Sequence, residues 1–345
     1  MLQNNYNSSE LRNKMLEEML SLLWRQWCAL GVQGHTKENG KNVIDPEALL
    51  LATCVFGRYE IRLFDQMLDW LTSYHKIINI NRLKSVIKKF PEDVRSIMGA
   101  VSESTGRANK DKKWLNLGQT CFKGTFSQTQ PLFLSEGAAS WKEHNCDEIF
   151  AKYGWFRKPI EHRKLIGKYQ LDSPSVLRIK MRYLFGINTR AEIMVYLACH
   201  NTGSYPTNIA REIECSQKNV NDTLVEMASS GFFELDNDGY RKSYRLSENL
   251  LKHLDNTPTW MNWMPVICFL SHFWEKLDDP GFLNLSPNSK SIEIRMMLKK
   301  NPYPVKFFAP TDIFPKGIQL NDTNLSNSVF CLADNLLKYI MLSDG

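Results

Sequence analysis

Apolar side chains recur at spacings of three and four residues along much of the chain, the pattern of helices that bury one face. The first such run lies in residues 9–30, and the second follows Asp45, an N-cap residue with a proline directly after it. Further helical patterns lie in 63–71 and 80–90. The pattern therefore predicts a helical N-terminal domain over residues 1–100.

The periodicity fades in residues 101–150, where Gly, Ser, Thr, Asn and Lys accumulate, and this composition predicts an irregular connection. A segment rich in aromatic and basic residues follows, 151–186, and it ends in a helical pattern, "SVLRIKMRYLFGI", whose apolar residues share a face. Helical patterns return in a C-terminal domain, 257–345, and these lie at 260–277, 286–299 and 326–342.

Residues 187–256 carry the clearest order of elements. Helical patterns in "TRAEIMVYLACHN" and "SYPTNIAREI" are followed by a third, "QKNVNDTLVEMASS", for which Ser216 is the N-cap. The next stretch, "FFELDNDGYRKSYRLS", predicts two strands joined by a tight turn at Asn237-Asp238-Gly239. The predicted order is therefore helix, helix, turn, helix, hairpin.

This order is similar to that of the winged helix-turn-helix superfamily, and most closely to its bacterial regulators of the MarR and ArsR kinds. The resemblance covers about residues 187–250 and rests on the spacing of Ile209, Ala210, Ser216, Val220, Leu224 and Gly231. Ala210 matches the small residue of the second helix, 216–230 the third helix, and 232–247 the hairpin wing. The flanking regions resemble those of uncharacterised bacterial proteins. The resemblance implies a mainly α protein with a central winged unit whose third helix enters the DNA major groove.

The third helix offers polar side chains for reading bases. If its apolar residues face the core, a rotation of about 100° per residue places Lys218, Asp222 and Val225 on the opposite side. Asparagine pairs with adenine, lysine donates to guanine and aspartate accepts from cytosine, while a helix N-terminus suits a phosphate. The expected DNA-binding residues of this helix are Ser216, Gln217, Lys218, Asn219, Asn221 and Asp222.

The hairpin adds cations, Arg241, Lys242 and Arg245, which either contact the DNA backbone or are solvated charges on an ordinary hairpin. Residues 205–247 hold five basic and seven acidic residues, so binding to phosphates needs cations from elsewhere. The basic segment before them is the expected source, unless it forms a solvated helix face or binds an acidic protein surface. Its candidate contacts to the DNA backbone are Arg178, Arg182 and Arg190.

Composition argues mainly against membrane-spanning, secreted and disulfide-linked classes of protein. A content of 43% hydrophobic and 23% charged residues is ordinary for a soluble globular chain, and a net charge of +6 permits a polyanionic partner. The longest apolar run is shorter than the roughly 20 residues of a membrane span, and the N-terminus lacks a signal-peptide pattern, which predicts a cytoplasmic location. Eight cysteines lie far apart without a CxxC pair, and we expect free, buried thiols.

Sequence motifs of catalysis are missing: we find no GxxxxGK[ST], GxSxG, HExxH or GxGxxG pattern. The neighbouring pairs His144 and Cys146, and Cys199 and His200, lack the second pair that a zinc site requires. The aromatic run in 260–274 is more typical of a core than of a ligand pocket. We therefore expect no enzyme activity, no metal and no cofactor.

Together these patterns predict a sequence-specific regulator of transcription that binds double-stranded DNA, as a homodimer on a palindromic site. The alternative is a protein-protein interaction module built on the same fold, with no direct DNA readout. In the first reading the N- and C-terminal helical regions supply dimerisation or a surface for a protein partner.

Overall fold

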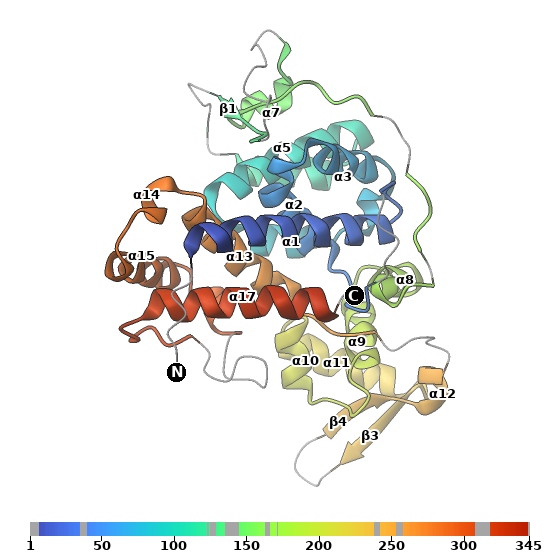
Figure 1. The fold of residues 1–345 in the computed structure, drawn as a ribbon. Coiled ribbons are helices and arrows are strands. Elements are labelled where there is room, and N and C mark those ends of the chain that lie inside the picture. The colour runs from blue at the N-terminus through green and yellow to red at the C-terminus, as the bar shows by residue number, and fades with distance from the viewer. Residues whose placement is uncertain are drawn as a thin grey trace.

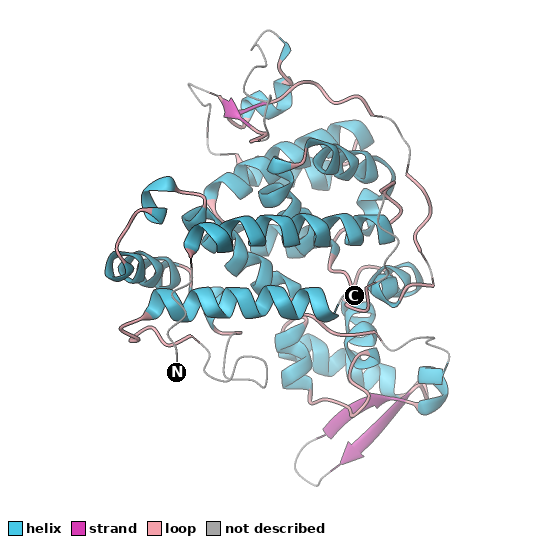
Figure 2. Ribbon diagram, viewed as in Figure 1, coloured by secondary structure: helices cyan, strands magenta, loops and turns pink. Residues whose placement is uncertain are grey.

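The computed structural model describes residues 7–34, 40–122, 124, 129–134, 145–162, 166–170, 172–237, 242–252, 258–307 and 318–343. Within these ranges the protein is mainly helical, with two small sheets of two strands each, which confirms the expected mainly α class (Figure 2). A large helical body carries a smaller unit of helices and a hairpin at one end (Figure 1).

The N-terminal part of the body is made of helices, and the first four of them begin close to where the sequence pattern predicts. Asp45 accepts a hydrogen bond from the backbone N of Ala48 at 3.1 Å, as an N-cap residue does. The helices are α1 (Ser8–Ala29), α2 (Pro46–Phe56), α3 (Ile61–Tyr74), α4 (Ile80–Val86), α5 (Glu92–Asn109) and α6 (Lys112–Cys121). Single-turn 3₁₀ helices lie at Gly57–Tyr59, His75–Ile77 and Ile87–Lys89.

The C-terminal helices complete the same body. They are α13 (Trp263–Leu277), α14 (Pro280–Leu283), α15 (Pro287–Lys300), α16 (Pro302–Val305) and α17 (Leu325–Ser343). In Figure 1, α17 lies alongside α1. One hydrophobic core contains Trp27 of α1, Phe56 of α2, Phe273 of α13 and Phe330 of α17. The two terminal regions, separate domains in the sequence analysis, therefore bury their apolar faces against each other.

The irregular connection expected over 101–150 is wrong for its first twenty residues, because α5 continues to Asn109 and α6 ends at Cys121. The two helices pack closely at small residues. A Cβ added at Gly99 would lie 2.5 Å from the ring of Tyr153, and one at Gly106 would lie 2.8 Å from Leu115. Glycines that weaken a sequence-based helix assignment are here the contact surface between helices.

Gly99→Ala tests that close packing. We expect a loss of roughly 1–3 kcal/mol in the free energy of unfolding, because the new methyl group overpacks the contact with Tyr153 and Cys121. Denaturant unfolding of the full chain measures it. Gly167→Ala is the matched control, since its Cβ would meet Gly31 O at an ordinary 3.4 Å. Equal stability of the two variants would contradict the packing described here.

The connection from α6 to α8 runs over the far end of the body. It contains α7 (Glu148–Lys152) and a parallel pair of short strands, β1 (Gln130–Pro131) and β2 (Trp155–Phe156). A 3₁₀ turn (Pro174–Val176) leads into α8 (Leu177–Phe185). Leu177 and Met181 of α8 are buried as expected, but Leu184 is 71% exposed and Phe185 is also exposed, so the apolar face does not extend to the end of this helix.

The remaining elements form the helix-hairpin unit, residues 189–246. It consists of α9 (Thr189–Ala198), α10 (Pro206–Glu212), α11 (Gln217–Ala228), β3 (Phe233–Asn237) and β4 (Lys242–Leu246), with α12 (Glu248–Lys252) after it. The strands pair antiparallel, with Phe233 opposite Leu246 and Leu235 opposite Tyr244. The Asp238-Gly239 turn predicted from the sequence lies outside the described residues. A second hydrophobic core, separate from that of the body, lies between these helices and strands.

Candidate nucleic-acid interface

Helix α11 is the element expected to read DNA, and its apolar side is buried within the helix-hairpin unit. Ser216 is its N-cap residue, and the Ser216 hydroxyl accepts from the backbone N of Asn219 at 3.3 Å. Val220, Leu224 and Met227 are buried in the core that they share with α9 and α10. The cap and the apolar spacing thus fix both where α11 begins and which side faces inward.

The polar side of α11 is open to solvent. All six candidate residues are exposed, namely Ser216, Gln217, Lys218, Asn219, Asn221 and Asp222. Val225 follows on the same outward side and is 62% exposed. The side-chain nitrogen of Asn219 donates to Thr189 Oγ1 at 2.6 Å, so its donor is engaged by the start of α9. Asn221 is the exposed asparagine better placed to bind a base.

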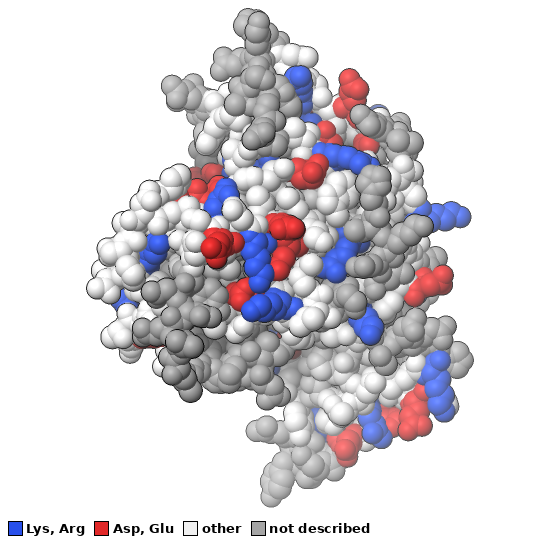
Figure 3. Space-filling model, in the orientation of Figure 1, with Lys and Arg blue, Asp and Glu red and all other residues white. Residues whose placement is uncertain are grey.

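One of the basic side chains of the hairpin is paired with an acidic side chain of the same hairpin. Arg245 is exposed but forms an ion pair with Glu234 on the neighbouring strand, 2.7 Å between Nη2 and Oε2. Lys242 is exposed at the start of β4, and Arg241 lies outside the described residues. Arg190 at the start of α9 is exposed and pairs with Glu226 of α11 at 2.6 Å. Acidic and basic side chains lie side by side over this unit in the view of Figure 3.

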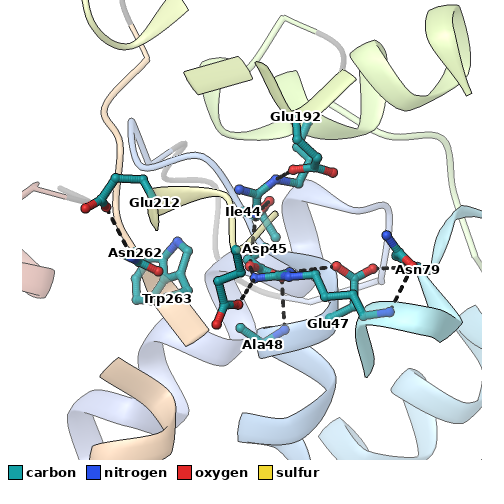
Figure 4. Close-up of polar contacts among 12 residues, drawn as sticks. Ile44, Asp45, Glu47, Ala48, Asn79, Glu192, Glu212, Asn262 and Trp263 are labelled. Atoms are coloured by element: carbon teal, nitrogen blue, oxygen red, sulfur yellow. Dashed lines mark hydrogen bonds and ion pairs between the residues drawn. The ribbon is translucent and has the colours of Figure 1, made fainter. Parts of the chain in front are cut away.

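Arg178 and Arg182 do not reach the surface, so their expected role as contacts to the DNA backbone is wrong. The side chain of Arg182 is fully buried and donates to Glu47 at 2.7 and 2.9 Å and to Glu192 at 2.8 and 3.0 Å. Arg178 is also buried and pairs with Asp45 and Glu192, at 3.1 Å in each case. Their carboxylate partners come from α2 or its N-cap and from α9 (Figure 4).

These side chains form a buried ion-pair cluster, defined as Asp45, Glu47, Arg82, Arg178, Arg182 and Glu192. Burial alone would raise the pKa of the Asp45 carboxyl, but Arg82 and Arg178 hold it well below its usual range. Burial would likewise lower the pKa of Arg182, but Glu47 and Glu192 raise it above its usual range. These shifts favour the charged forms of Asp45 and Arg182, and the ion pairs of the cluster join the body to α8 and α9.

The rest of the basic and aromatic segment is also mostly structural. Tyr153, Trp155 and Phe156 are buried, and the indole N–H of Trp155 donates to Ser96 at 2.9 Å. Arg157 is buried and pairs with Asp65 of α3 at 2.9 Å. Three of the cations that were expected to offset the acidic helix-hairpin unit, Arg157, Arg178 and Arg182, are thus buried and paired with carboxylates of the protein. Lys158 and Lys168 of the same segment are exposed.

An exposed apolar stretch lies close to α11 and was not anticipated. It consists of Tyr183, Leu184, Phe185 and Ile187, the end of α8 and the loop before α9. The next two residues, Asn188 and Thr189, cap and begin α9, and Thr189 accepts the hydrogen bond from Asn219. The helical pattern of 175–187 obscured this stretch, because it assigns its apolar residues to a buried face.

The cysteines and histidines are the other side chains that the sequence analysis considered for chemistry. The eight cysteines are free thiols, four of them buried, and burial raises the pKa of Cys199 to about 12. His200 Nδ1 lies 2.7 Å from the carbonyl oxygen of Tyr196, and His144 lies outside the described residues. Across the described ranges no group of three or more His, Cys, Asp or Glu side chains is arranged to hold a metal ion. No described helix combines the length and apolarity that a membrane crossing requires.

Comparisons with known protein families, with curated proteins and with solved structures gave no match to this chain.

Proposed function

We propose that the protein binds double-stranded DNA in a sequence-specific manner, with the helix-hairpin unit acting as a winged helix-turn-helix. The observation that carries the proposal is the division of α11 into a buried apolar side and an exposed polar side that no described segment covers. The short turn from α10 and the hairpin after α11 are the other parts that such a unit needs.

In this proposal the outward side of α11 enters the major groove. Asn221 pairs with adenine and Lys218 donates to guanine, while Val225 packs on the methyl group of a thymine. The N-terminus of α11, with Ser216 and Gln217, faces a phosphate. Lys242 of the hairpin contacts the backbone beside the groove. The mixed charges of the unit make the sequence-independent part of binding weak, so base contacts carry a larger share of the affinity.

A homodimer would place two copies of α11 on half-sites about one helical turn apart, and a regulator of transcription would bind as such a dimer to a palindromic operator. Selection of bound fragments from a random double-stranded DNA library, at fixed salt concentration, tests class and symmetry together. A recovered palindrome supports both parts of the proposal. Failure to enrich any sequence from the library would refute sequence-specific binding.

Asn221→Ala tests the base contact. We expect a loss of roughly 1–3 kcal/mol in binding to the selected site and relaxed preference at one base position, because the amide makes paired hydrogen bonds there. Lys242→Ala should instead weaken binding to all sequences and reduce the salt dependence by about one phosphate contact. Gel-shift titrations at several salt concentrations separate the two effects, and Asn116→Ala on the exposed side of α6 is the control.

A second candidate function is favoured by the exposed apolar stretch at the end of α8. Exposed apolar side chains in the segment that leads into α9 are poorly suited to face phosphates, and exposed apolar surface is a feature of protein-binding sites. If the unit is a protein-interaction module, Leu184→Asp should abolish capture of a partner from nuclease-treated lysate and leave DNA binding unchanged. Under the first proposal, capture should not survive the removal of nucleic acid.

A further inference from the structure

The turn between α10 and α11 contains a residue with an unusual backbone conformation. Glu214 has φ of 54°, in the left-handed region, and among the described residues only Lys110 shares this property without being glycine. Glycine and asparagine adopt this conformation readily, whereas a side chain such as that of glutamate adopts it at a cost. A residue that strains the backbone is retained where its side chain makes contacts that compensate.

The carboxylate of Glu214 makes such contacts, all with the helical body. Its Oε2 accepts from Arg82 of α4 at 3.3 Å, and its Oε1 accepts from the hydroxyl of Tyr303 in α16. The ammonium of Lys89 lies 3.7 Å from Oε1 and 3.5 Å from the centre of the Tyr303 ring. Three separate elements of the body therefore converge on one side chain of the turn.

Burial strengthens these contacts. The Glu214 side chain is only 12% exposed and that of Arg82 15% exposed, so water screens their charges weakly. Burial and the neighbouring Glu214 carboxylate both raise the pKa of Tyr303, which therefore remains a hydrogen-bond donor at neutral pH. Arg82 also binds Asp45 at 2.7 Å and Glu47 at 2.9 Å, which connects Glu214 to the buried ion-pair cluster.

A second link to the body lies two residues earlier in the chain. Glu212, the last residue of α10, accepts from Asn262 at 3.1 Å (Figure 4). It also accepts from the indole N–H of Trp260 at 3.3 Å. The connection is thus held at two residues, Glu212 by the segment before α13 and Glu214 by α4, α16 and Lys89.

We infer that Glu214 is a positioning residue, which holds the α10–α11 turn on the helical body and so fixes the direction in which α11 points. The inference rests on the proposed function for its effect on DNA, but the attachment itself is a property of the free protein. A rigid mount matters for DNA reading, because base contacts require a helix held in one orientation whereas phosphate contacts tolerate several.

The substitution Glu214→Gly separates positioning from turn formation, because the two roles predict opposite signs. Glycine relieves the backbone at positive φ and also removes a negative charge near the proposed DNA surface. If the side chain served only the turn, Glu214→Gly would stabilise the connection and strengthen binding to DNA. If it positions the unit, the same substitution loosens the unit and weakens specific binding.

Lys110→Gly is the matched control, because Lys110 has φ of 55° and an exposed side chain at the end of α5. Hydrogen exchange is measured by mass spectrometry on peptides covering α10, the turn and α4, in the full chain without DNA. We expect exchange there to rise by about tenfold or more in Glu214→Gly, as loss of a charge-assisted hydrogen bond implies, and to stay unchanged in Lys110→Gly.

Tyr303→Phe is the second variant, since it removes the donor to Glu214 and keeps the ring under Lys89. We expect it to raise exchange at the same peptides, and Glu214→Gln, which keeps one accepting oxygen, to restore part of the protection. In DNA titrations, Glu214→Gly should lose about tenfold in affinity for the selected site and nothing for random DNA.

Exchange in Glu214→Gly and Tyr303→Phe equal to that of Lys110→Gly would overturn the inference. Equal or tighter binding of Glu214→Gly to the selected site would overturn it as well. If the wild-type chain binds no DNA, the proposed function fails, and the exchange measurements still decide whether Glu214 holds the turn.

Discussion

Replacing Arg182 with alanine should lower the free energy of unfolding by roughly 3–5 kcal/mol, the loss found when one partner of a buried ion pair is removed. The Arg182 guanidinium donates to Glu47, to Glu192 and to the carbonyl oxygen of Ile77, and its side chain has no exposed surface. Without it, two carboxylates from α2 and α9 stay buried with fewer cations nearby. Denaturant unfolding at pH 7 measures the loss.

Acidification should reduce the loss of unfolding free energy in Arg182→Ala, and the direction of this effect follows from the pKa of Glu192. Burial would raise its pKa, but the nearby guanidiniums, Arg182 foremost, hold it below its usual range. In the wild type its contribution to stability is therefore complete above the unfolded pKa of about 4.3 and is lost as the pH falls through the lower folded value. In Arg182→Ala the Glu192 carboxyl keeps its burial and loses the strongest of the cations that lower its pKa. We therefore expect its pKa to rise above that of the wild type, so that protonation relieves the buried charge. The stability difference between the two proteins should shrink from pH 7 toward pH 4.

Arg190→Ala is the control for this prediction. Arg190 pairs with Glu226 at 2.6 Å on the surface of the helix-hairpin unit, and exposed pairs contribute about 0–1 kcal/mol. If Arg182→Ala were as stable as Arg190→Ala, the buried cluster would contribute no net stability to the junction. A difference that stays constant from pH 7 to pH 4 would show that uncompensated carboxylates are not the cause of the loss.

The helix-hairpin unit was the part of the fold that could be predicted best, because its signals are local. The hydroxyl of Ser216 caps α11 by accepting from the backbone N of Asn219, three residues later. The spacing of Val220, Leu224 and Met227 determines which side of the helix faces inward. Strand pairing followed from short apolar runs on either side of an Asp-Gly turn. Such rules act within a few residues, so they hold whatever surrounds the unit.

The roles of Arg178 and Arg182 were predicted wrongly because their partners are distant in sequence. A charge count over 151–190 finds excess cations, yet Asp45 and Glu47 lie more than a hundred residues earlier. One local signal was available. Both arginines lie next to the apolar positions Leu177 and Met181 on α8, on the side that packs inward.

The fold of the helical body was harder to predict, because its contacts also join residues that are distant in sequence. Gly99, Gly106 and Gly118 lower helix propensity, and the close packing of α5, α6 and the ring of Tyr153 explains them. The shared core of the terminal regions likewise depends on pairings across more than two hundred residues, such as that of Phe56 with Trp274. Sequence periodicity identifies these helices but does not state which of them meet.

Trp274→Ala should lower the free energy of unfolding by roughly 3–5 kcal/mol, as is usual when a large buried aromatic side chain is truncated. The ring lies 5.4 Å from Phe56 and 5.4 Å from Tyr59, centre to centre, and the guanidinium of Arg12 lies 5.2 Å from its centre. All three neighbours belong to the N-terminal part of the body. Truncation in α13 therefore opens a cavity between segments from opposite ends of the chain.

Because the two regions share one core, the variant should lose protection from hydrogen exchange in α1 and α2 as much as in α13, within a single unfolding transition. Ile292→Ala on the exposed side of α15 is the control and should change stability by less than about 0.5 kcal/mol. If residues 1–100 were a domain of their own, α1 and α2 would keep their protection while α13 lost it. That pattern would mean that the shared core does not couple the folding of the two terminal regions.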